Sequence, residues 1–264
     1  MEYTEFLLDK QDGIAVVTLN RPDKLNALTF DTYRALGDLW AELREDDSVK
    51  VVVITGTGKA FCSGGDVTEI IGKLRNSGSD VLINFQRMAG RATHGLLTLR
   101  KPAIAAINGT ATGAGIVIAS ACDIRIAVES AKFAFLFPRV GLVSSDLGAC
   151  WLLPKLVGLT KATELLITGD TFNSADAEKM GFLTKLVPDD KLMEAAMEYA
   201  KKLASLAPLA TAMTKELIYR EASMDFSTAI DVEGWLMALS LHTADHKEAG
   251  IAFEEKRRPV FRGK

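Results

Sequence analysis

The order of apolar and polar residues predicts alternating strands and helices in the first part of the chain. Apolar, β-branched runs at 13–20 and 50–56 predict strands, and Gln11-Asp12-Gly13 before the first run predicts a hairpin turn. Between these runs the apolar residues recur with a helical period, and Thr29 is placed to cap the helix. The apolar face of that helix carries Tyr33, Leu36, Leu39, Trp40 and Leu43. The N-terminal part is therefore expected to run strand, strand, helix, strand.

The alternation continues to about residue 190, and the chain then becomes helical. A long helix is predicted over 80–99, and strand-like runs follow at 102–109, 122–128 and 132–135. From Lys191 onward the apolar spacing is that of helices, with little strand signal. The expected architecture is an α/β core followed by a helical appendage.

Composition excludes several classes of protein. Apolar residues make up 48% of the 264 residues, which is too many for a disordered chain. The 31 Lys and Arg residues against 34 Asp and Glu residues leave a formal charge of −3, which argues against a dedicated nucleic-acid-binding protein. Cys62, Cys122 and Cys150 are widely spaced, which predicts buried thiols of a reducing compartment. The sequence contains no apolar leader and no membrane-spanning run, so a soluble cytoplasmic protein is expected.

Two glycine-rich turns, at 56–70 and 107–123, stand where predicted strands lead into helices. Neither matches a nucleotide-binding loop, because Val53 replaces the first glycine of a phosphate loop and Gly113-x-Gly115 lacks the third glycine of the dinucleotide fingerprint. Such turns expose backbone N–H groups at helix N-termini, and two of them side by side can direct two donors at one oxygen. The alternative is that the glycines only permit tight turns.

The chain also carries a set of segments whose order and spacing are typical of one protein family. They are LNRPDKLNAL (19–28), GKAFCSGGD (58–66), KPAIAAINGTATGAG (101–115), ACDIRIA (121–127), LPKLVGLTKATELLITGD (153–170), SADAEKMGFLTKLVP (174–188) and FEEKRRPVFRG (253–263). Together they resemble the crotonase (enoyl-CoA hydratase/isomerase) superfamily, and the resemblance covers nearly the whole chain.

The resemblance implies an α/β fold built as a crotonase-like spiral of ββα units, followed by helices used for trimer formation. The expected division is a spiral core over 1–195 and a helical oligomerisation segment over 196–264. The resemblance also implies an acyl-CoA thioester as substrate, with no metal and no cofactor apart from the coenzyme A of the substrate. The expected partners are further copies of the chain, in a homotrimer or a dimer of trimers, with no nucleic acid and no membrane.

The resemblance also assigns residues to the substrate site. The thioester oxygen is expected to be held by the backbone N–H groups of Gly65, after Gly64, and of Ala114, after Gly113. The other positions expected at the substrate or its CoA are Lys24, Leu25, Lys59, Ala60, Cys62, Asp66, Phe137 and Lys256. Of these, Lys256 belongs to a basic segment that is expected to reach the CoA of a neighbouring subunit. As the alternative, the lysines are solvated surface residues.

The two glutamates that hydratases of this family use are absent, since their positions hold Val117 and Phe137. One carboxylate remains in this region, Asp146, which is expected to transfer a proton or to attack the substrate as a nucleophile. Its alternative role is to cap a helix that starts near Leu147. Ordinary two-carboxylate hydration is therefore in doubt.

Two further side chains are candidates for a part in the chemistry. His94 stands where a dehalogenase branch of the family carries a histidine, although a histidine on an apolar helix is more often packed in the core. Glu69, one helical turn beyond Gly65, is placed to orient substrate or water. His242 and His246 stand at i, i+4 spacing without an evident third ligand, so surface residues are expected there and not a metal site.

Three functions remain open from the sequence. The first is hydration or isomerisation of an enoyl-CoA, with Asp146 as the acid and base. The second is substitution or hydrolysis on an aryl- or β-substituted acyl-CoA, as in a dehalogenase, with Asp146 as the nucleophile. The third is a non-catalytic homologue that binds acyl-CoA or RNA, and the acidic balance of charges weighs against RNA.

Overall fold

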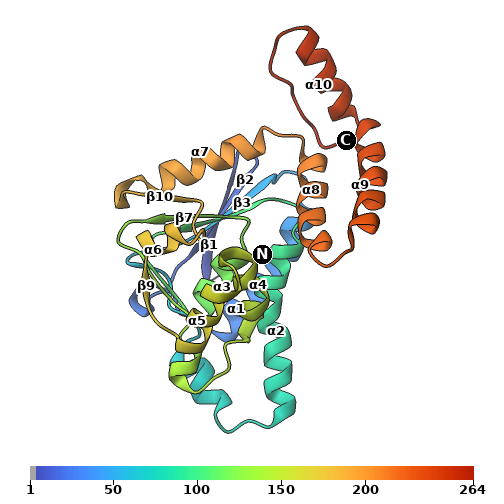
Figure 1. Cartoon of the computed structure of the whole chain (residues 1–264). Coiled ribbons are helices and arrows are strands. Elements are labelled where there is room, and N and C mark those ends of the chain that lie inside the picture. The colour runs from blue at the N-terminus through green and yellow to red at the C-terminus, as the bar shows by residue number, and fades with distance from the viewer. Residues whose placement is uncertain (1–3) are drawn as a thin grey trace.

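The computed structural model describes residues 4–264, and a six-stranded sheet forms its centre (Figure 1). In spatial order the strands are β1 (Phe6–Gln11), β2 (Ile14–Leu19), β3 (Val51–Gly56), β5 (Ala103–Ile107), β7 (Ile124–Val128) and β10 (Lys185–Val187). β1 and β2 are antiparallel, whereas the other neighbours are parallel. The inner strands β3 and β5 are buried along almost their whole length. Such continuous apolar strands are typical of a parallel sheet that is covered on both faces.

The hairpin turn predicted before the second strand is confirmed. Gln11 pairs with Ile14, which leaves Asp12 and Gly13 as a two-residue loop between β1 and β2. Both loop residues have a positive φ, 53° for Asp12 and 78° for Gly13. This is the combination of a type I′ turn, which favours Asp-Gly and matches the twist of the two strands.

A second, four-stranded sheet contains β4 (Ala60–Cys62), β6 (Thr110–Thr112), β8 (Lys132–Ala134) and β9 (Phe172–Asn173) in this order. Its first three strands are parallel, and each follows a strand of the first sheet along the chain: β4 follows β3, β6 follows β5, and β8 follows β7. Helical segments follow each pair of strands. The α/β fold with repeated ββα units is therefore confirmed.

The helices between the strands are α1 (Phe30–Glu45), α2 (Ser79–Thr98), α3 (Ala114–Ala121), α4 (Ala149–Val157), α5 (Leu159–Thr168) and α6 (Ser174–Lys179). The predicted cap of α1 is confirmed, since Thr29 Oγ1 accepts from Thr32 N at 3.1 Å and Thr32 Oγ1 accepts from Thr29 N at 3.2 Å. α1 packs against α2, and the Trp40 indole donates to Ala92 O at 2.9 Å across this contact.

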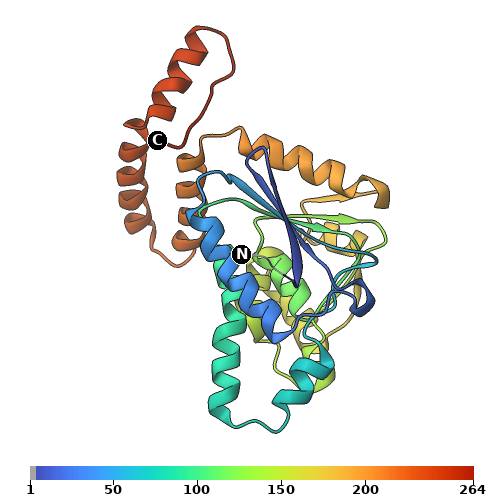
Figure 2. The ribbon, with the colours of Figure 1, turned by 180° about the vertical axis from the view of Figure 1, so that it is seen from behind.

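Four helices end the chain: α7 (Leu192–Ala204), α8 (Pro208–Glu221), α9 (Phe226–Leu241) and α10 (Ala244–Glu254). α7 covers the first sheet and contacts β2, β3, β5 and β7, whereas α9 and α10 lie beside the core at one side of the molecule (Figures 1 and 2). The domain boundary expected at residue 195 therefore falls inside a helix that belongs to the core. The division into a spiral core and a helical oligomerisation segment stays a prediction.

Candidate functional site

The two glycine-rich turns meet backbone to backbone. Gly64 has a φ of 100°, and a Cβ placed on it would lie 3.1 Å from Thr112 O and 3.3 Å from Ala114 N. Thr112 Oγ1 also donates to Ser63 O at 3.1 Å, which ties the second turn to the first. A side chain at position 64 would therefore be strained and would press against the second turn, so glycine is required there.

This contact leaves two backbone donors unused. The first turn is held by Leu28 N donating to Gly64 O and by Asp66 N donating to Leu28 O, both at 2.8 Å, which leaves out the N–H of Gly65. Ala114 is the first residue of α3, where an N–H has no acceptor inside the helix. Within residues 4–264, neither N–H has a hydrogen-bond acceptor. The Ala114 N–H also stands at the positive end of the α3 dipole.

The close approach of α3 to β4 fixes the second turn against the first. A Cβ on Gly115 would lie 2.2 Å from Cys62 O, so only glycine allows this packing. Cys62 is 0% exposed and Ala60 is 1% exposed, so neither of these predicted CoA-contact residues presents accessible surface. Burial raises the pKa of the Cys62 thiol to about 12, which keeps it neutral and unreactive. Cys150, by contrast, is exposed, so the expectation that all three thiols are buried is wrong for this residue.

The carboxylate of Asp66 is occupied by structural contacts. It caps the π-helical turn η2 (Val67–Gly72) by accepting from Thr68 N at 3.0 Å and from Glu69 N at 3.1 Å, and Arg21 pairs with it at 3.1 Å. The Glu69 N–H and Arg21 lower its pKa. The Glu69 carboxylate itself pairs with Lys73 on the half-exposed outer side of η2. Asp66 therefore holds the helix after the first turn, and Glu69 offers no unpaired base.

Asp146 is a carboxylate without such partners. It opens the short helix η4 (Asp146–Gly148), and its Oδ1 is buried with no hydrogen-bond partner among the described residues. Burial raises its pKa, although the Gln86 side chain and the Leu147 N–H favour the charged form. The alternative of helix capping is wrong, because α4 begins only at Ala149 and no side chain caps it.

Tyr33 is a site residue that the sequence analysis placed only in the core. It is 2% exposed, and its hydroxyl oxygen lies 3.6 Å from where a Cβ on Gly65 would be. Burial and the negative charge of Asp146 both raise its pKa. Tyr33 is thus a neighbour of both the first glycine turn and Asp146. The sequence offered one signal for it. The apolar face of this helix otherwise carries leucines and Trp40, and a tyrosine hydroxyl on such a face needs a hydrogen-bond partner.

The predicted CoA-binding lysines lie beside the first turn. Lys24 ends η1 (Pro22–Lys24), and the next residue, Leu25, accepts a hydrogen bond from Ser63 N at 3.0 Å. Lys59 immediately follows Gly58, whose Cβ position would lie 3.2 Å from Pro22 Cβ. Both lysines are exposed, as is Leu25, and neither lysine forms an ion pair within the described chain. The two ammonium groups are therefore free to bind phosphate.

Other predicted residues lie elsewhere. Lys256 lies two residues beyond the end of α10, which stands beside the core, so Lys256 belongs to the C-terminal segment (Figure 1). His94 is exposed and not packed in the core. The preceding residue, Thr93, donates to Leu147 O at 2.9 Å, but within residues 4–264 no hydrogen bond or ion pair joins His94 to Asp146.

A groove of 520 Å³ runs between α2, α4 and α8, next to Asp146. Gln86 and Leu147 line it, and both also touch the Asp146 carboxylate through the interactions that set its pKa. His94, Trp151 and Tyr219 line its other parts. The groove is mostly apolar and leads away from Asp146.

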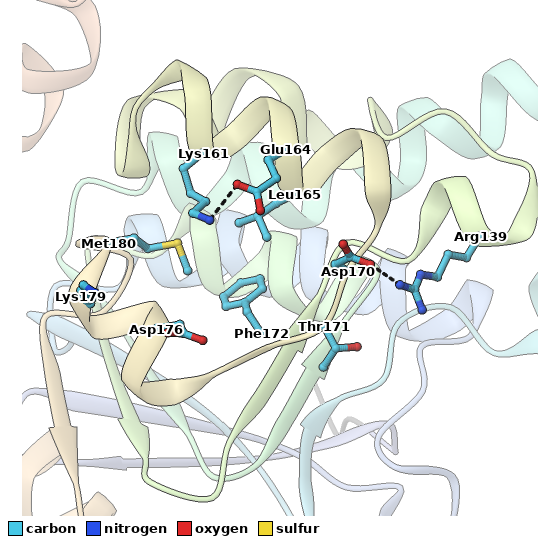
Figure 3. Close-up of a pocket in the computed structure, with 10 residues that line it drawn as sticks. All are labelled: Arg139, Lys161, Glu164, Leu165, Asp170, Thr171, Phe172, Asp176, Lys179 and Met180. Atoms are coloured by element: carbon cyan, nitrogen blue, oxygen red, sulfur yellow. Dashed lines mark hydrogen bonds and ion pairs between the residues drawn. The ribbon is translucent and has the colours of Figure 1, made fainter.

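A separate cavity of 780 Å³ lies between α5, β9 and α6, with Arg139 at its edge (Figure 3). Its basic groups include Arg139, paired with Asp170, and Lys161, paired with Glu164 at 2.8 Å. Neither glycine turn nor Asp146 lines it. We therefore place the candidate site at the glycine turns, where unpaired donors and an unpaired carboxylate occur, and not at this cavity.

Two further possibilities are limited to the described part of the chain. Within residues 4–264, no group of three or more His, Cys, Asp or Glu side chains is arranged to hold a metal ion. The Asp245 carboxylate, between His242 and His246, accepts from Arg262 N and Gly263 N and so fixes the C-terminal tail. Across these same residues, no helix has the length and apolar character needed to cross a membrane.

Comparison with known proteins gives matches over the whole length. The family model described as enoyl-CoA hydratase/isomerase matches residues 9–264. A short-chain-enoyl-CoA hydratase of Clostridium acetobutylicum is 36% identical over 98% of this chain and 97% of that protein. A 1,2-epoxyphenylacetyl-CoA isomerase of Escherichia coli is 32% identical over 98% of this chain and 99% of that protein.

Solved structures agree with the sequence matches. A proposed enoyl-CoA hydratase of Streptomyces coelicolor A3(2) is 44% identical, with a TM-score of 0.97 over 100% of this chain and 96% of that one. An enoyl-CoA hydratase of Bacillus anthracis is 31% identical, with a TM-score of 0.93 over 99% of this chain and 100% of that one.

Proposed function

Because the chain belongs to the enoyl-CoA hydratase/isomerase family, we propose that it shifts or hydrates a double bond in an acyl-CoA thioester. In this proposal the N–H groups of Gly65 and Ala114 hold the thioester oxygen, and Asp146 transfers the proton. The observation that carries the proposal is the contact between the two glycine turns, which leaves two neighbouring N–H groups without an acceptor in residues 4–264.

The paired N–H groups supply electrostatic stabilisation of the reacting thioester. Removing a proton from the carbon next to the thioester carbonyl, or adding water to the double bond, moves negative charge onto that oxygen. Donors that are already oriented stabilise this charge without reorganisation, and each is typically worth about 3 kcal/mol of the barrier. The N-terminus of α3 adds its positive end to the Ala114 donor.

Asp146 is suited to proton transfer in this setting. Its Oδ1 is buried and free of partners, so it can accept a proton from carbon and return it elsewhere on the same enolate. Burial raises its pKa, which makes the ionised form a stronger base than an exposed aspartate. The positions that hold glutamates in related hydratases hold Val117, 0% exposed, and Phe137, 6% exposed. A single carboxylate favours double-bond isomerisation over hydration.

The coenzyme A part of the substrate has basic groups available. The unpaired ammonium groups of Lys24 and Lys59, next to the first glycine turn, support binding of its phosphates. Lys256 follows the projecting helix α10, so in a homotrimer it would serve the site of a neighbouring subunit. The chemistry proposed here needs no resident metal or cofactor, because the thioester itself accepts the electrons.

A second candidate function is substitution or hydrolysis with Asp146 as the nucleophile. The unpartnered Oδ1 favours this alternative as well, because a nucleophilic oxygen must be free to reach carbon. Reaction in ¹⁸O-labelled water, followed by mass analysis of the peptide that contains Asp146, separates the two. Label in the carboxylate supports a nucleophile, whereas an unlabelled carboxylate after many turnovers supports proton transfer.

The experiment that tests the main proposal is a mass-spectrometric screen of enoyl-CoA thioesters in deuterated water. Isomerisation gives a product with exchanged deuterium, hydration adds the mass of water, and hydrolysis releases free CoA. We expect isomerised product, with loss of activity in Asp146→Asn by a factor of about 10²–10⁴. Full activity of this variant across the panel would contradict the role of Asp146. Salt-dependent binding of RNA without any turnover would instead support a non-catalytic homologue.

A further inference from the structure

Tyr33 has a hydroxyl for which the described part of the chain provides no partner. The residue is 2% exposed, and its O–H forms no hydrogen bond within residues 4–264. The fully buried polar side-chain atoms without a partner in this part of the chain are Asp146 Oδ1 and Glu221 Oε1, so the Tyr33 hydroxyl is not sealed off and a ligand can reach it. An accessible donor that lies beside the proposed reaction site and has no acceptor within these residues is a candidate for binding the substrate.

The aromatic ring of Tyr33 is held in place by its neighbours. It packs edge-on against Phe85 of α2, with ring centroids 5.7 Å apart and planes at 86°, and Phe85 packs in the same way against Phe30 at 5.2 Å. These contacts belong to the interface between α1 and α2. The hydroxyl therefore stays next to Gly65, 3.6 Å from the Cβ position of that residue.

The hydroxyl also remains protonated. Burial and the charge of Asp146 raise the pKa of Tyr33 well above its ordinary value, so the group acts as a neutral donor at physiological pH. The groups that act on it are the Asp146 carboxylate and the buried, neutral Cys62 thiol, and the Cβ position of Gly65 lies 3.6 Å from the hydroxyl. The Tyr33 hydroxyl is consequently a neutral hydrogen-bond donor without an acceptor in residues 4–264.

An ordinary hydrocarbon enoyl-CoA offers no acceptor for this donor. The thioester carbonyl oxygen has two lone pairs, and in the proposed function Gly65 and Ala114 use both. The acyl chain beyond it carries only carbon and hydrogen, and Ile70, Val117 and Phe137 are apolar and buried. The Asp146 carboxylate acts on Tyr33 through its charge, and no hydrogen bond joins the two side chains within residues 4–264.

Resting on the proposed function, we propose that Tyr33 is a specificity residue that donates its hydrogen bond to an oxygen carried by the acyl group. The preferred substrate is therefore an oxygen-bearing acyl-CoA, with a hydroxyl or carbonyl oxygen close to the reacting double bond. A hydroxyl at this position can also donate to Oδ1 of Asp146 while it accepts from Tyr33. Each unpaired polar group of the site then has a partner.

The test compares thioesters that differ by one hydroxyl, with crotonyl-CoA and γ-hydroxycrotonyl-CoA as the shortest pair. For the unmodified protein, we expect kcat/KM to favour the hydroxylated member by at least about tenfold. In Tyr33→Phe, which keeps the ring and its packing, the ratio of the two kcat/KM values should fall to about one, because the hydroxylated member loses more than the hydrocarbon member. Tyr199→Phe, on α7 against the core, is the matched control and should keep the preference.

The outcomes separate the proposal from the function on which it rests. If Tyr33→Phe lowers kcat/KM for both thioesters by the same factor, the hydroxyl serves the thioester oxygen or the fold, and the specificity role is overturned. The specificity role is also overturned if Tyr33→Phe keeps the full preference for the hydroxylated thioester. In both cases the protein still converts an acyl-CoA, so the proposed function stands. If the unmodified protein neither binds nor converts any member of such pairs, the acyl-CoA function fails and the substrate preference fails with it.

Discussion

At the scale of single residues, the N–H of Gly65 can be removed without removing a side chain. Gly65→Pro deletes the donor, while the neighbouring hydrogen bonds of Leu28 use Gly64 O and Asp66 N and remain possible. Loss of one donor to a developing oxyanion lowers kcat by about 10²–10³-fold, and we expect a loss of this size. Steady-state kinetics on the best thioester of the screen would measure it.

Gly65→Ala is the matched control for this prediction. Its Cβ would lie 3.6 Å from the Tyr33 hydroxyl and 3.7 Å from Ile70, which are ordinary contacts, and the N–H is kept. We therefore expect kcat within about tenfold of the unmodified protein, well above that of the proline variant. Equal losses in both variants would show that shape at this position matters and that the donor does not.

The two aspartates of the site are expected to affect stability in opposite directions. Burial raises the pKa of Asp146 in the folded state, so its ionisation destabilises the fold as pH rises through the raised pKa. Asp146→Asn should therefore increase the melting temperature at neutral pH, and the gain should vanish at acid pH. The pKa of Asp66 is lowered by the Glu69 N–H and Arg21, so its contribution to stability is lost as pH falls through that lowered pKa. Asp66→Asn should decrease the melting temperature at neutral pH.

Thermal unfolding of both variants over a range of pH checks these signs. The same raised pKa of Asp146 should appear in catalysis, because a base must be ionised: the acid limb of the kcat/KM profile should lie above the ordinary range of aspartates. A variant that loses activity while gaining stability is the expected signature of a residue kept for chemistry. A destabilised Asp146→Asn would instead indicate that the carboxylate is structural.

At the scale of elements, the sequence predicted what local chemistry determines. The strand at 50–56 appears as Val51–Gly56 because a continuous β-branched run suits a buried parallel strand, and the helix at 80–99 appears as Ser79–Thr98. Asp12-Gly13 and the Thr29 cap were readable because turn and cap geometries select particular residues.

Features set by tertiary contacts could not be predicted in this way. Leu147 has a φ of 53°, so the backbone after Asp146 turns away from the helix that the sequence suggested, and α4 starts later. Tyr33 fits the helical period of a core face, and only the fold brings its hydroxyl beside Gly65. The unpaired state of Asp146 depends on which groups surround it in space. The glycine pattern indicated the turns, and the resemblance to a family supplied their roles and Asp146, whereas a tyrosine on an apolar helix face indicates only that its hydroxyl needs a partner.

A buried ion pair attaches α8 to the core. Lys215, 6% exposed, donates to Leu96 O at 2.9 Å and to Lys101 O at 3.0 Å, and pairs with Asp123 Oδ2 at 2.7 Å. Tyr219 donates to the other carboxylate oxygen at 3.1 Å. All three ammonium protons are therefore used, and the pair determines where the C-terminal helices begin.

Removing one partner of this pair should loosen α8. We expect Lys215→Met to lower the free energy of unfolding by about 3 kcal/mol, because the half-buried Asp123 loses its cation and the carbonyls of Leu96 and Lys101 lose their donor. Chemical denaturation measures the loss, and hydrogen exchange should locate it in α8. Lys201→Met, at an exposed position of α7, is the control and should change stability by less than about 0.5 kcal/mol. A similarly small effect of Lys215→Met would mean that apolar packing alone positions α8.

At the scale of the whole molecule, the C-terminal segment leaves large apolar side chains uncovered. α9 has no fully buried residue, and large side chains on α9 and α10 face outward, with Phe226 80%, Trp235 70% and Phe253 86% exposed. Apolar surface of this extent, beside the core in Figures 1 and 2, is typical of an interface. Lys256 lies just beyond α10, and in the proposed function it serves the site of a neighbouring copy, so the proposed interface also bears on substrate binding.

We therefore expect a homotrimer, or a dimer of trimers, in solution, and expect Trp235→Arg to dissociate it. Burying a tryptophan dominates many interfaces, and a charge in its place is left without a partner, so sedimentation velocity should show mostly monomer. Leu7→Arg, at a 56% exposed position on β1, is the control and should sediment like the unmodified protein. If Lys256 serves a neighbouring site, the monomeric variant should also show a higher KM for acyl-CoA with Lys24 and Lys59 intact. A monomeric unmodified protein with full activity would show that each chain builds its site alone.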